Sequence, residues 1–143
     1  MSVTPESLEA AGWKRIEAEG FTGHVGPFWM LDEENSRTLG LFVEPKHCNV
    51  HLGTLHGGVA MTFADIGLGS GVAKVLGEQR LNCVTASLNT QFISIARIGE
   101  FIQVTPEIIR QSKALVFVRG LIKVDDKIIA SAEGIWKVLE PRS

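Results

Sequence analysis

Tyrosine is absent from this 143-residue sequence, cysteine occurs only twice, and neither sign of charge is in excess. Without tyrosine, no phenol hydroxyl can assist in chemistry. Cys48 and Cys83 lie far apart and form no CxxC pair, so we expect free thiols in a reducing compartment. The 14 Lys and Arg residues nearly balance the 16 Asp and Glu residues, which argues against a nucleic-acid partner.

Long apolar runs are also missing. The apolar stretches are short and interrupted, so we expect no membrane-spanning helix and no membrane partner. The N-terminus has neither the basic region nor the apolar region of a signal peptide, and we therefore expect a cytoplasmic protein. With 45% hydrophobic residues, the chain has enough apolar side chains for one core, which predicts a single domain over residues 1–143.

The first third of the chain predicts one short helix and two strands. A Thr-Pro-Glu helix start at residues 4–6 makes residues 1–22 an N-terminal helical segment. Residues 24–30 are an apolar run interrupted by Gly and Pro, which predicts a strand or an edge strand. Residues 38–43 predict a second strand, and a loop follows over about 46–55.

Residues 56–76 predict a long buried helix, because apolar residues fall on every side of it and Gly77 ends it. Gly67, Gly69 and Gly71 recur at every second position. Each glycine costs about 1 kcal/mol relative to alanine inside a helix. We therefore expect another part of the chain to approach the helix backbone closely, and a sheet wrapped around the helix would do so.

After the helix the hydrophobic period changes to two, which predicts β-structure. In the first strand, Val84 and Phe92 face one side and Thr85 faces the other. Three further strands are predicted at 100–110, with Pro106 marking a bulge or an edge, at 114–124 and at 127–139, after a tight turn at Asp125-Asp126. Antiparallel strands around one segregated helix predict the α+β class.

The stretch before the long helix, HCNVHLGTLHGG at 47–58, is the densest polar feature. Gly57 and Gly58 leave backbone N–H groups unhindered at a helix start, where the helix dipole favours developing negative charge. That is the physics of an oxyanion hole. The same glycines also suit a tight turn from loop to helix.

Three histidines and one cysteine in the same stretch raise the question of zinc. These four residues are His47, Cys48, His51 and His56. A structural zinc site normally draws its four ligands as spaced pairs, and this spacing matches no common pattern. We therefore expect no metal.

Asp65 is a lone carboxylate among apolar residues of the long helix. Burying an unpaired charge is costly, so this carboxylate is either hydrogen-bonded for structure or kept for function with a raised pKa. It lies eight residues after Gly57, which is about 12 Å along the helix axis and about 80° around it. The two residues cannot meet over one small reacting group, so a site that uses both requires a second subunit.

Four segments together resemble the PaaI-like branch of the hotdog-fold acyl-CoA thioesterases. They are HCN at 47–49, GTLHGG at 53–58, FADIG at 63–67 and VTASLNTQF at 84–92. The resemblance covers nearly the whole chain and implies a long helix wrapped by an antiparallel sheet. It also implies hydrolysis of an aryl or medium-chain acyl-CoA to acid and free CoA, without metal or cofactor, by a homodimer with shared sites that forms a dimer of dimers.

The resemblance assigns catalytic roles to five residues. The Gly57 N–H polarises the thioester carbonyl, while Asn49 and His56 shape that end of the site. Asp65 of the facing subunit acts on water as general base, or attacks as nucleophile. Thr85 aligns with a hydroxyl residue that positions the water, although it also suits an ordinary strand position.

Gly58 is a further candidate for substrate binding, and side chains of both subunits around Met61, Phe63, Leu68 and the first strands would set the length of the acyl pocket. Coenzyme A phosphates require cations, and the candidates are Arg97, Arg110, Lys113 and Arg119. The chain also departs from the family pattern. One extra residue lies between Asn49 and Gly53, which could displace the Asn49 side chain.

The sequence is also compatible with two other functions. A hotdog dehydratase acts on 3-hydroxyacyl thioesters with a histidine and an acidic partner, and here His56 lacks dehydratase-like surroundings. A non-catalytic acyl-CoA binder would use the same pocket without turnover and would be indifferent to loss of Asp65.

Overall fold

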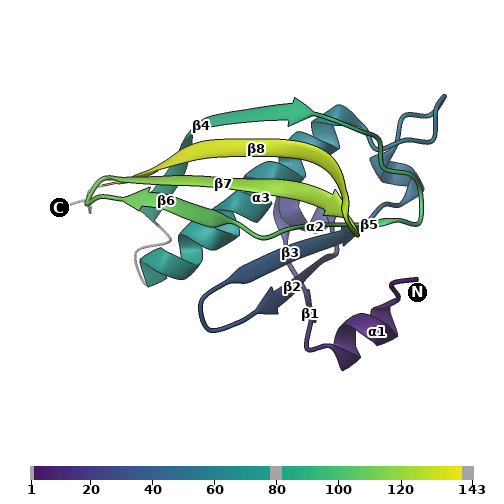
Figure 1. Cartoon of the computed structure of the whole chain (residues 1–143), viewed down its shortest axis with the longest axis horizontal. Helices are drawn as coiled ribbons and strands as arrows, with labels where there is room; N and C mark the ends of the chain where they lie inside the picture. Colours follow the sequence, from purple (N-terminus) through teal and green to yellow (C-terminus); the bar gives the residue numbers. More distant parts are fainter. Residues whose placement is uncertain (1, 78–81, 140–143) are drawn as a thin grey trace.

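The computed structural model describes residues 2–77 and 82–139, which form an eight-stranded antiparallel sheet around one long helix, α3 (Gly57–Leu76) (Figure 1). The shorter helical segments are α1 (Pro5–Ala10), α2 (Gly20–Val25) and the 3-10 turn η1 (Pro45–His47). The strands are β1 (Lys14–Ile16), β2 (Phe28–Asp32), β3 (Arg37–Phe42), β4 (Cys83–Phe92), β5 (Phe101–Val104), β6 (Glu107–Gln111), β7 (Leu115–Val124) and β8 (Lys127–Val138).

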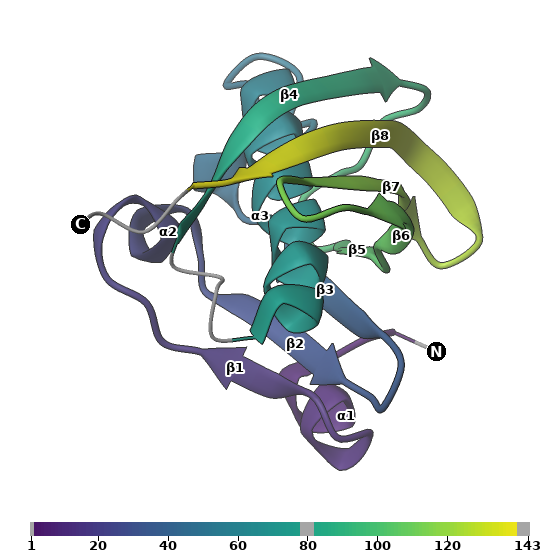
Figure 2. The same cartoon turned by 90° about the vertical axis from the view of Figure 1, so that its left-hand side faces the viewer.

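The strands are ordered β1-β2-β3-β5-β7-β8-β4, and β6 pairs with β7 beside this path. Figure 2 shows the sheet curving around α3. One edge of the sheet is the three-residue β1, whereas the other edge is β4, which is ten residues long. The architecture confirms the predicted α+β class.

The N-terminal prediction is confirmed for the helix and corrected around it. Thr4 caps α1 through its hydroxyl and forms a capping box with Ser7, as the Thr-Pro-Glu start predicts. Residues 1–22 are not all helical, however, because β1 and the start of α2 also lie there. The strand expected at 24–30 begins only at Phe28, since Pro27 offers no N–H to a neighbouring strand.

The strand predicted at 100–110 is two strands. It breaks around Pro106: β5 pairs with β3 and β7, and β6 pairs with β7 alone. Proline removes one donor from the ladder and turns the chain away from β3. The remaining strands and the Asp125-Asp126 turn match their predicted positions to within one residue.

A bulge in β4 changes which face Thr85 occupies. The alternation predicts that Thr85 and Phe92 lie on opposite faces, but the register to β8 shifts between Thr85 and Ser87. Two consecutive residues on the bulged strand then oppose one on its neighbour, and the alternation reverses. Thr85 and Phe92 therefore both face α3.

The glycines of α3 confirm the predicted close approach of the sheet at two of three positions. A Cβ added at Gly67 would lie 2.4 Å from Cγ1 of Val104, and one at Gly71 would lie 2.6 Å from Cβ of Pro106. At Gly69 the nearest atom would be Nε1 of Trp136 at 3.6 Å, an ordinary contact. Of these three glycines, the packing of the chain requires Gly67 and Gly71 but not Gly69.

The helix is buried on one side and not, as predicted, all round. Phe63, Ala64, Leu68 and Val72 are fully buried against the sheet, whereas Met61 is 40% exposed. By length and composition α3 is apolar enough to cross a membrane. The expectation that every apolar stretch of the chain is too short or too interrupted for this is therefore wrong. In the fold, this helix is the core of the domain.

A second small core lies on the opposite face of the sheet, under α1. It contains Leu8, Trp13, Trp29 and Phe101, and the rings of Trp13 and Phe101 meet edge to face with centroids 5.4 Å apart. The N-terminal segment is thereby anchored to β2 and β5.

An ion cluster joins the β2–β3 turn to the last part of α3. Asp32 accepts hydrogen bonds from Arg37 at 3.1 Å and from Lys74 at 2.6 Å, and Arg37 also donates to the Ser70 carbonyl. The hydrogen bond from Arg37, followed by that from Lys74, lowers the pKa of Asp32 from 3.8 to about 2.

We expect Gly67→Ala to lower the free energy of unfolding by about 1–3 kcal/mol, because the stiff side chain of Val104 must move to admit a methyl group. Gly69→Ala is the matched control and should raise it by up to about 1 kcal/mol, since the methyl group fits and glycine disfavours the helix. Urea titration measures both. Equal effects at the two positions would contradict the close approach.

The Asp32 cluster predicts a pH dependence of stability. Its carboxylate has a lower pKa in the folded chain than in the unfolded chain, so its contribution is complete above about pH 4 and disappears as the pH falls toward 2. The side chain is half exposed, which limits the contribution to under about 1 kcal/mol. Asp32→Asn should remove this part of the acid dependence in urea titrations, whereas Glu34→Gln should leave it unchanged.

Candidate active site

His56 caps the start of α3 with its ring. Nδ1 of His56 accepts the backbone N–H of Gly58 at 2.8 Å. A Cβ at Gly58 would lie only 3.1 Å from the same nitrogen, so glycine lets the ring come this close. The Gly58 N–H is therefore occupied within the chain and is not the free donor that the sequence suggested.

The N–H of Gly57 is different, because it has no hydrogen-bond partner within residues 2–77 and 82–139. A Cβ at Gly57 would meet only the ring of Phe92, at an ordinary 3.7 Å. Packing within one chain therefore does not require glycine here. The residue leaves an open space and a free donor at the positive end of the helix dipole.

The loop before the helix closes on itself. The backbone N–H and the side-chain amide of Asn49 both donate to the Thr54 carbonyl, at 2.9 and 3.4 Å. Gly53 adopts a φ of +65°, which only glycine adopts readily, and Val50 and Leu52 are 92% and 72% exposed at the tip. The loop, which has one extra residue between Asn49 and Gly53, thus keeps the Asn49 side-chain amide bonded to the Thr54 carbonyl.

His47 bonds to the backbone through its ring. Both of its ring nitrogens contact backbone groups, those of Glu44 and Val25, whereas His51 is exposed in the loop. Across the part of the chain that the structure describes, no three His, Cys, Asp or Glu side chains could hold a metal ion. Burial raises the pKa of the Cys48 and Cys83 thiols, which disfavours a thiolate nucleophile.

Asp65 lies on the open side of α3, half-buried rather than enclosed. The hydroxyl of Thr85 donates to its Oδ1 at 2.7 Å. The bulge in β4 makes this bond possible because it turns Thr85 toward the helix. The carboxylate is thus oriented by a hydroxyl group, and its second oxygen is left to accept a proton.

Within one chain, Asp65 and Gly57 do not form a single site. Asp65 contacts Thr85 near the beginning of β4, whereas Gly57 lies beside Phe92 at the end of that strand. The structure therefore agrees with the separation predicted from helix geometry. For acyl transfer, Gly57 alone offers only a hydrogen-bond donor and Asp65 alone offers only a carboxylate.

The predicted phosphate contacts lie at two different ends of the molecule. Arg97 is exposed. It lies beside the start of α3, because its backbone forms a β-bridge with Thr54. Arg110 and Lys113 lie in β6 and the turn after it, toward the end of α3 (Figure 1). Only Arg97 is near Gly57 within the chain.

The acyl-pocket prediction is also revised. Phe63 and Leu68 are fully buried in the core and cannot line a pocket, while Met61, one turn after Gly57, is exposed. The exposed face of α3 therefore carries Gly57, Met61 and Asp65 along one side.

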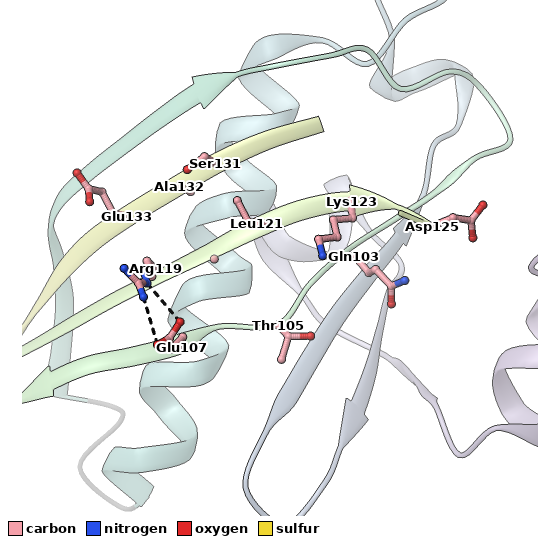
Figure 3. Close-up of a pocket in the computed structure, with 11 residues that line it drawn as sticks. Gln103, Thr105, Glu107, Arg119, Leu121, Lys123, Asp125, Ser131, Ala132 and Glu133 are labelled. Carbon is pink, nitrogen blue, oxygen red and sulfur yellow. Dashed lines mark hydrogen bonds and ion pairs between the residues drawn. The ribbon is translucent and has the colours of Figure 1, made fainter. Parts of the chain in front are cut away.

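A hollow of about 800 Å³ lies elsewhere, on the outer face of the sheet (Figure 3). Its side chains include Arg119 and Leu121, which alternate along β7 with Val118 and Ile122, buried toward α3. Arg119 is paired there with Glu107 at 3.2 Å. This hollow is separated from Gly57 and Asp65 by the sheet itself.

The Thioesterase superfamily model matches residues 52–130 of the sequence. Human acyl-coenzyme A thioesterase 13 is 36% identical over 118 residues, which cover 82% of each sequence. The chain belongs to the thioesterase superfamily.

Solved structures share the fold of this chain. The PaaI protein from the phenylacetic acid degradation operon of Escherichia coli superposes with a TM-score of 0.72 at 16% identity, over 87% of both chains. BH2602 of Bacillus halodurans, solved with CoA, gives 0.68 at 25% identity, over 79% of this chain and 74% of that one. The predicted hotdog fold and PaaI-like relationship are confirmed.

Sequence reasoning missed two residues of this thioesterase-superfamily site. In the sequence His47 is a zinc candidate and part of the HCN motif, whereas the structure shows a buried residue of the loop. Phe92 is predicted as a strand residue of the VTASLNTQF motif, and in the structure its ring borders Gly57. No local signal marks Phe92, because the contact joins a strand end to a helix start distant in the sequence.

Proposed function

We propose that this protein hydrolyses an acyl-CoA thioester to a carboxylic acid and free CoA. The observation that carries the proposal is the free N–H of Gly57 at the start of α3, on the same open helix face as the hydroxyl-bonded carboxylate of Asp65. One group stabilises an oxyanion and the other activates water. Those two tasks are what hydrolysis of an ester or thioester requires.

In the proposed mechanism, the thioester carbonyl oxygen accepts the Gly57 N–H, where the helix dipole stabilises negative charge. His56 occupies the Gly58 N–H, whereas the Gly57 N–H has no partner within the described residues and is the proposed donor. His56 Nδ1 accepts a hydrogen bond from the Gly58 N–H, so the ring carries its proton on Nε2, which is available as a second donor. Asn49 acts on this end indirectly, by closing the loop.

Asp65 then removes a proton from water, whose oxygen attacks the carbonyl carbon. The tetrahedral oxyanion collapses, the carbon–sulfur bond breaks, and the CoA thiolate leaves and takes up a proton. The Thr85 hydroxyl holds the carboxylate and so sets its direction. The alternative is direct attack by Asp65 on the carbonyl carbon, which expels the CoA thiolate and leaves a mixed anhydride. Attack of water on the Asp65 carbonyl of that anhydride would then place label from isotopic water in the Asp65 carboxylate after a single turnover.

The complete site requires a second copy of the chain. In the described residues β4 is an unpaired edge of ten residues, and such an edge is a template for pairing with another strand. Antiparallel pairing of two β4 strands about a point between Leu88 and Asn89 places Phe92 of each copy opposite Thr85 of the other. Gly57 of one copy then faces Asp65 of its partner.

Exposed apolar side chains along this edge support the same arrangement. Phe92 and Met61 are 56% and 40% exposed, on β4 and on the open face of α3. Exposed apolar side chains of this kind are typical of an interface. We infer a homodimer with two shared sites as the minimal active unit, which a dimer of dimers would contain twice.

The proposal that the substrate contains CoA rests on relatives and not on a phosphate-binding site in the described residues. One relative is named an acyl-coenzyme A thioesterase, and a similar structure was solved with CoA. Arg97 is the predicted cation closest to Gly57, and the partner subunit would supply others. We infer aryl or medium-chain acyl groups, since the side chains bordering Gly57 are apolar.

We expect rapid thiol release from a panel of aromatic and straight-chain acyl-CoAs by the wild-type protein. Asp65→Asn should lower turnover by about 10²–10⁴-fold, because it removes the base, while keeping the fold. Release that is equally fast in the variant would remove Asp65 from the mechanism. Binding of acyl-CoA without release would favour the non-catalytic binder, and hydration of enoyl-CoA would favour the dehydratase.

Gly57→Pro isolates the proposed donor. Proline suits the first position of a helix, and His56 has the extended backbone (φ −66°, ψ 136°) that proline requires before it. The variant should fold normally and lose about 10²–10³-fold in turnover, because only the N–H is removed. Gly57→Ala keeps that N–H and is the matched control in the same assay.

The shared site predicts complementation. Mixing unfolded Asp65→Asn and Gly57→Pro chains and refolding them together should restore activity at about a quarter of the sites, those that combine both intact residues. Each variant refolded alone should stay inactive. A mixture as inactive as its components would show that the site lies within one chain.

A further inference from the structure

His47 is the most buried polar side chain near the start of α3, with 2% of its surface exposed. Its Nδ1 accepts the backbone N–H of Glu44 at 2.9 Å, and its Nε2 lies 2.6 Å from the carbonyl oxygen of Val25. Since an amide nitrogen only donates and a carbonyl only accepts, the ring is neutral and carries its proton on Nε2. Both nitrogens are therefore committed to backbone groups.

The bond to Val25 belongs to a larger attachment of α2. Lys46 donates through Nζ to the carbonyls of His24 and Gly26, at 3.0 and 2.7 Å. Two successive side chains thus hold three successive carbonyls at the end of α2. The last carbonyls of a helix lack partners within it, and here η1 supplies them.

On its other side, the backbone of His47 is joined to the start of α3. Its carbonyl accepts the N–H of His56 at 2.8 Å, and His56 in turn caps Gly58. Residues 47 and 56 form the base of the closed loop that contains Asn49. One residue therefore connects the end of α2, the turn η1 and the helix start that presents the Gly57 N–H.

We propose that His47 is a positioning residue for the Gly57 N–H, an inference that rests on the proposed function. It contacts no reacting atom. Its two ring bonds fix the loop base relative to α2, and the loop base fixes the direction in which the donor points. A donor stabilises an oxyanion only when it is aimed correctly, and a displacement of about 1 Å costs up to about 10²-fold in rate.

The test compares His47→Phe, which keeps an aromatic ring and loses both bonds, with His47→Gln, whose amide can still donate to the Val25 carbonyl. We expect kcat for thiol release to fall about ten- to a hundredfold in His47→Phe with KM unchanged, and to recover in part in His47→Gln. The Gly57 amide signal in the nitrogen–proton NMR spectrum should shift in His47→Phe and return toward its original position in His47→Gln.

Thr38→Val is the control for a general loss of stability. The Thr38 hydroxyl is buried and lies 2.6 Å from that of Thr105, far from the start of α3. This variant should also unfold at lower urea, yet keep kcat and the Gly57 signal. If His47→Phe changes kcat and the Gly57 signal no more than Thr38→Val does, the positioning role is wrong.

The NMR signal separates this inference from the proposed function. A Gly57 signal that shifts in His47→Phe, in a protein that releases no thiol from any acyl-CoA, would support the positioning role and refute the thioesterase proposal. Thiol release by the wild type with unchanged kcat in His47→Phe would do the reverse.

Discussion

The contact of the α3 backbone with the sheet at Gly67 and Gly71 is the constraint on which the rest of the structure depends. Any side chain at these positions would overlap with Val104 or Pro106. The helix is therefore held close to the sheet, and its rotation about its own axis is fixed. That rotation decides that Phe63 and Leu68 enter the core while Gly57, Met61 and Asp65 remain on the open side.

The open side of α3 lies beside the unpaired edge strand β4, because Asp65 contacts Thr85 and Gly57 lies beside Phe92. A chain with an apolar helix face and a ten-residue strand edge in water has surface that a second copy can cover. The bulge between Thr85 and Ser87 has a part in this, because it turns the Thr85 hydroxyl toward Asp65 just where the edge strand begins. In the proposed dimer, assembly and catalysis use the same residues.

At the start of α3, side chains hold the backbone in place, and a backbone group is the proposed donor. His56 occupies the Gly58 N–H, Asn49 holds its own loop, and His47 ties that loop to α2. The Gly57 N–H stays without a partner in the described residues and is the proposed donor. A helix start is suited to this role because its first N–H groups lack partners within the helix.

Sequence alone predicted the long helix, its need for a close neighbour, the strands after it and the α+β class, because each rests on local periodicity or on the cost of glycine in a helix. It also identified Gly57 and Asp65 and showed that helix geometry keeps them apart. The division of 100–110 into β5 and β6 was not predicted, since a single proline marks equally well a bulge, an edge or a break.

Tertiary structure decided the rest. The alternation along β4 could not reveal the bulge, because a bulge depends on the register of two strands and not on one sequence. In the same way, the contact of Phe92 with Gly57 and the bonds of His47 join segments distant in the chain. Local preferences determine which elements form, whereas the partners of each side chain are set only when those elements pack together.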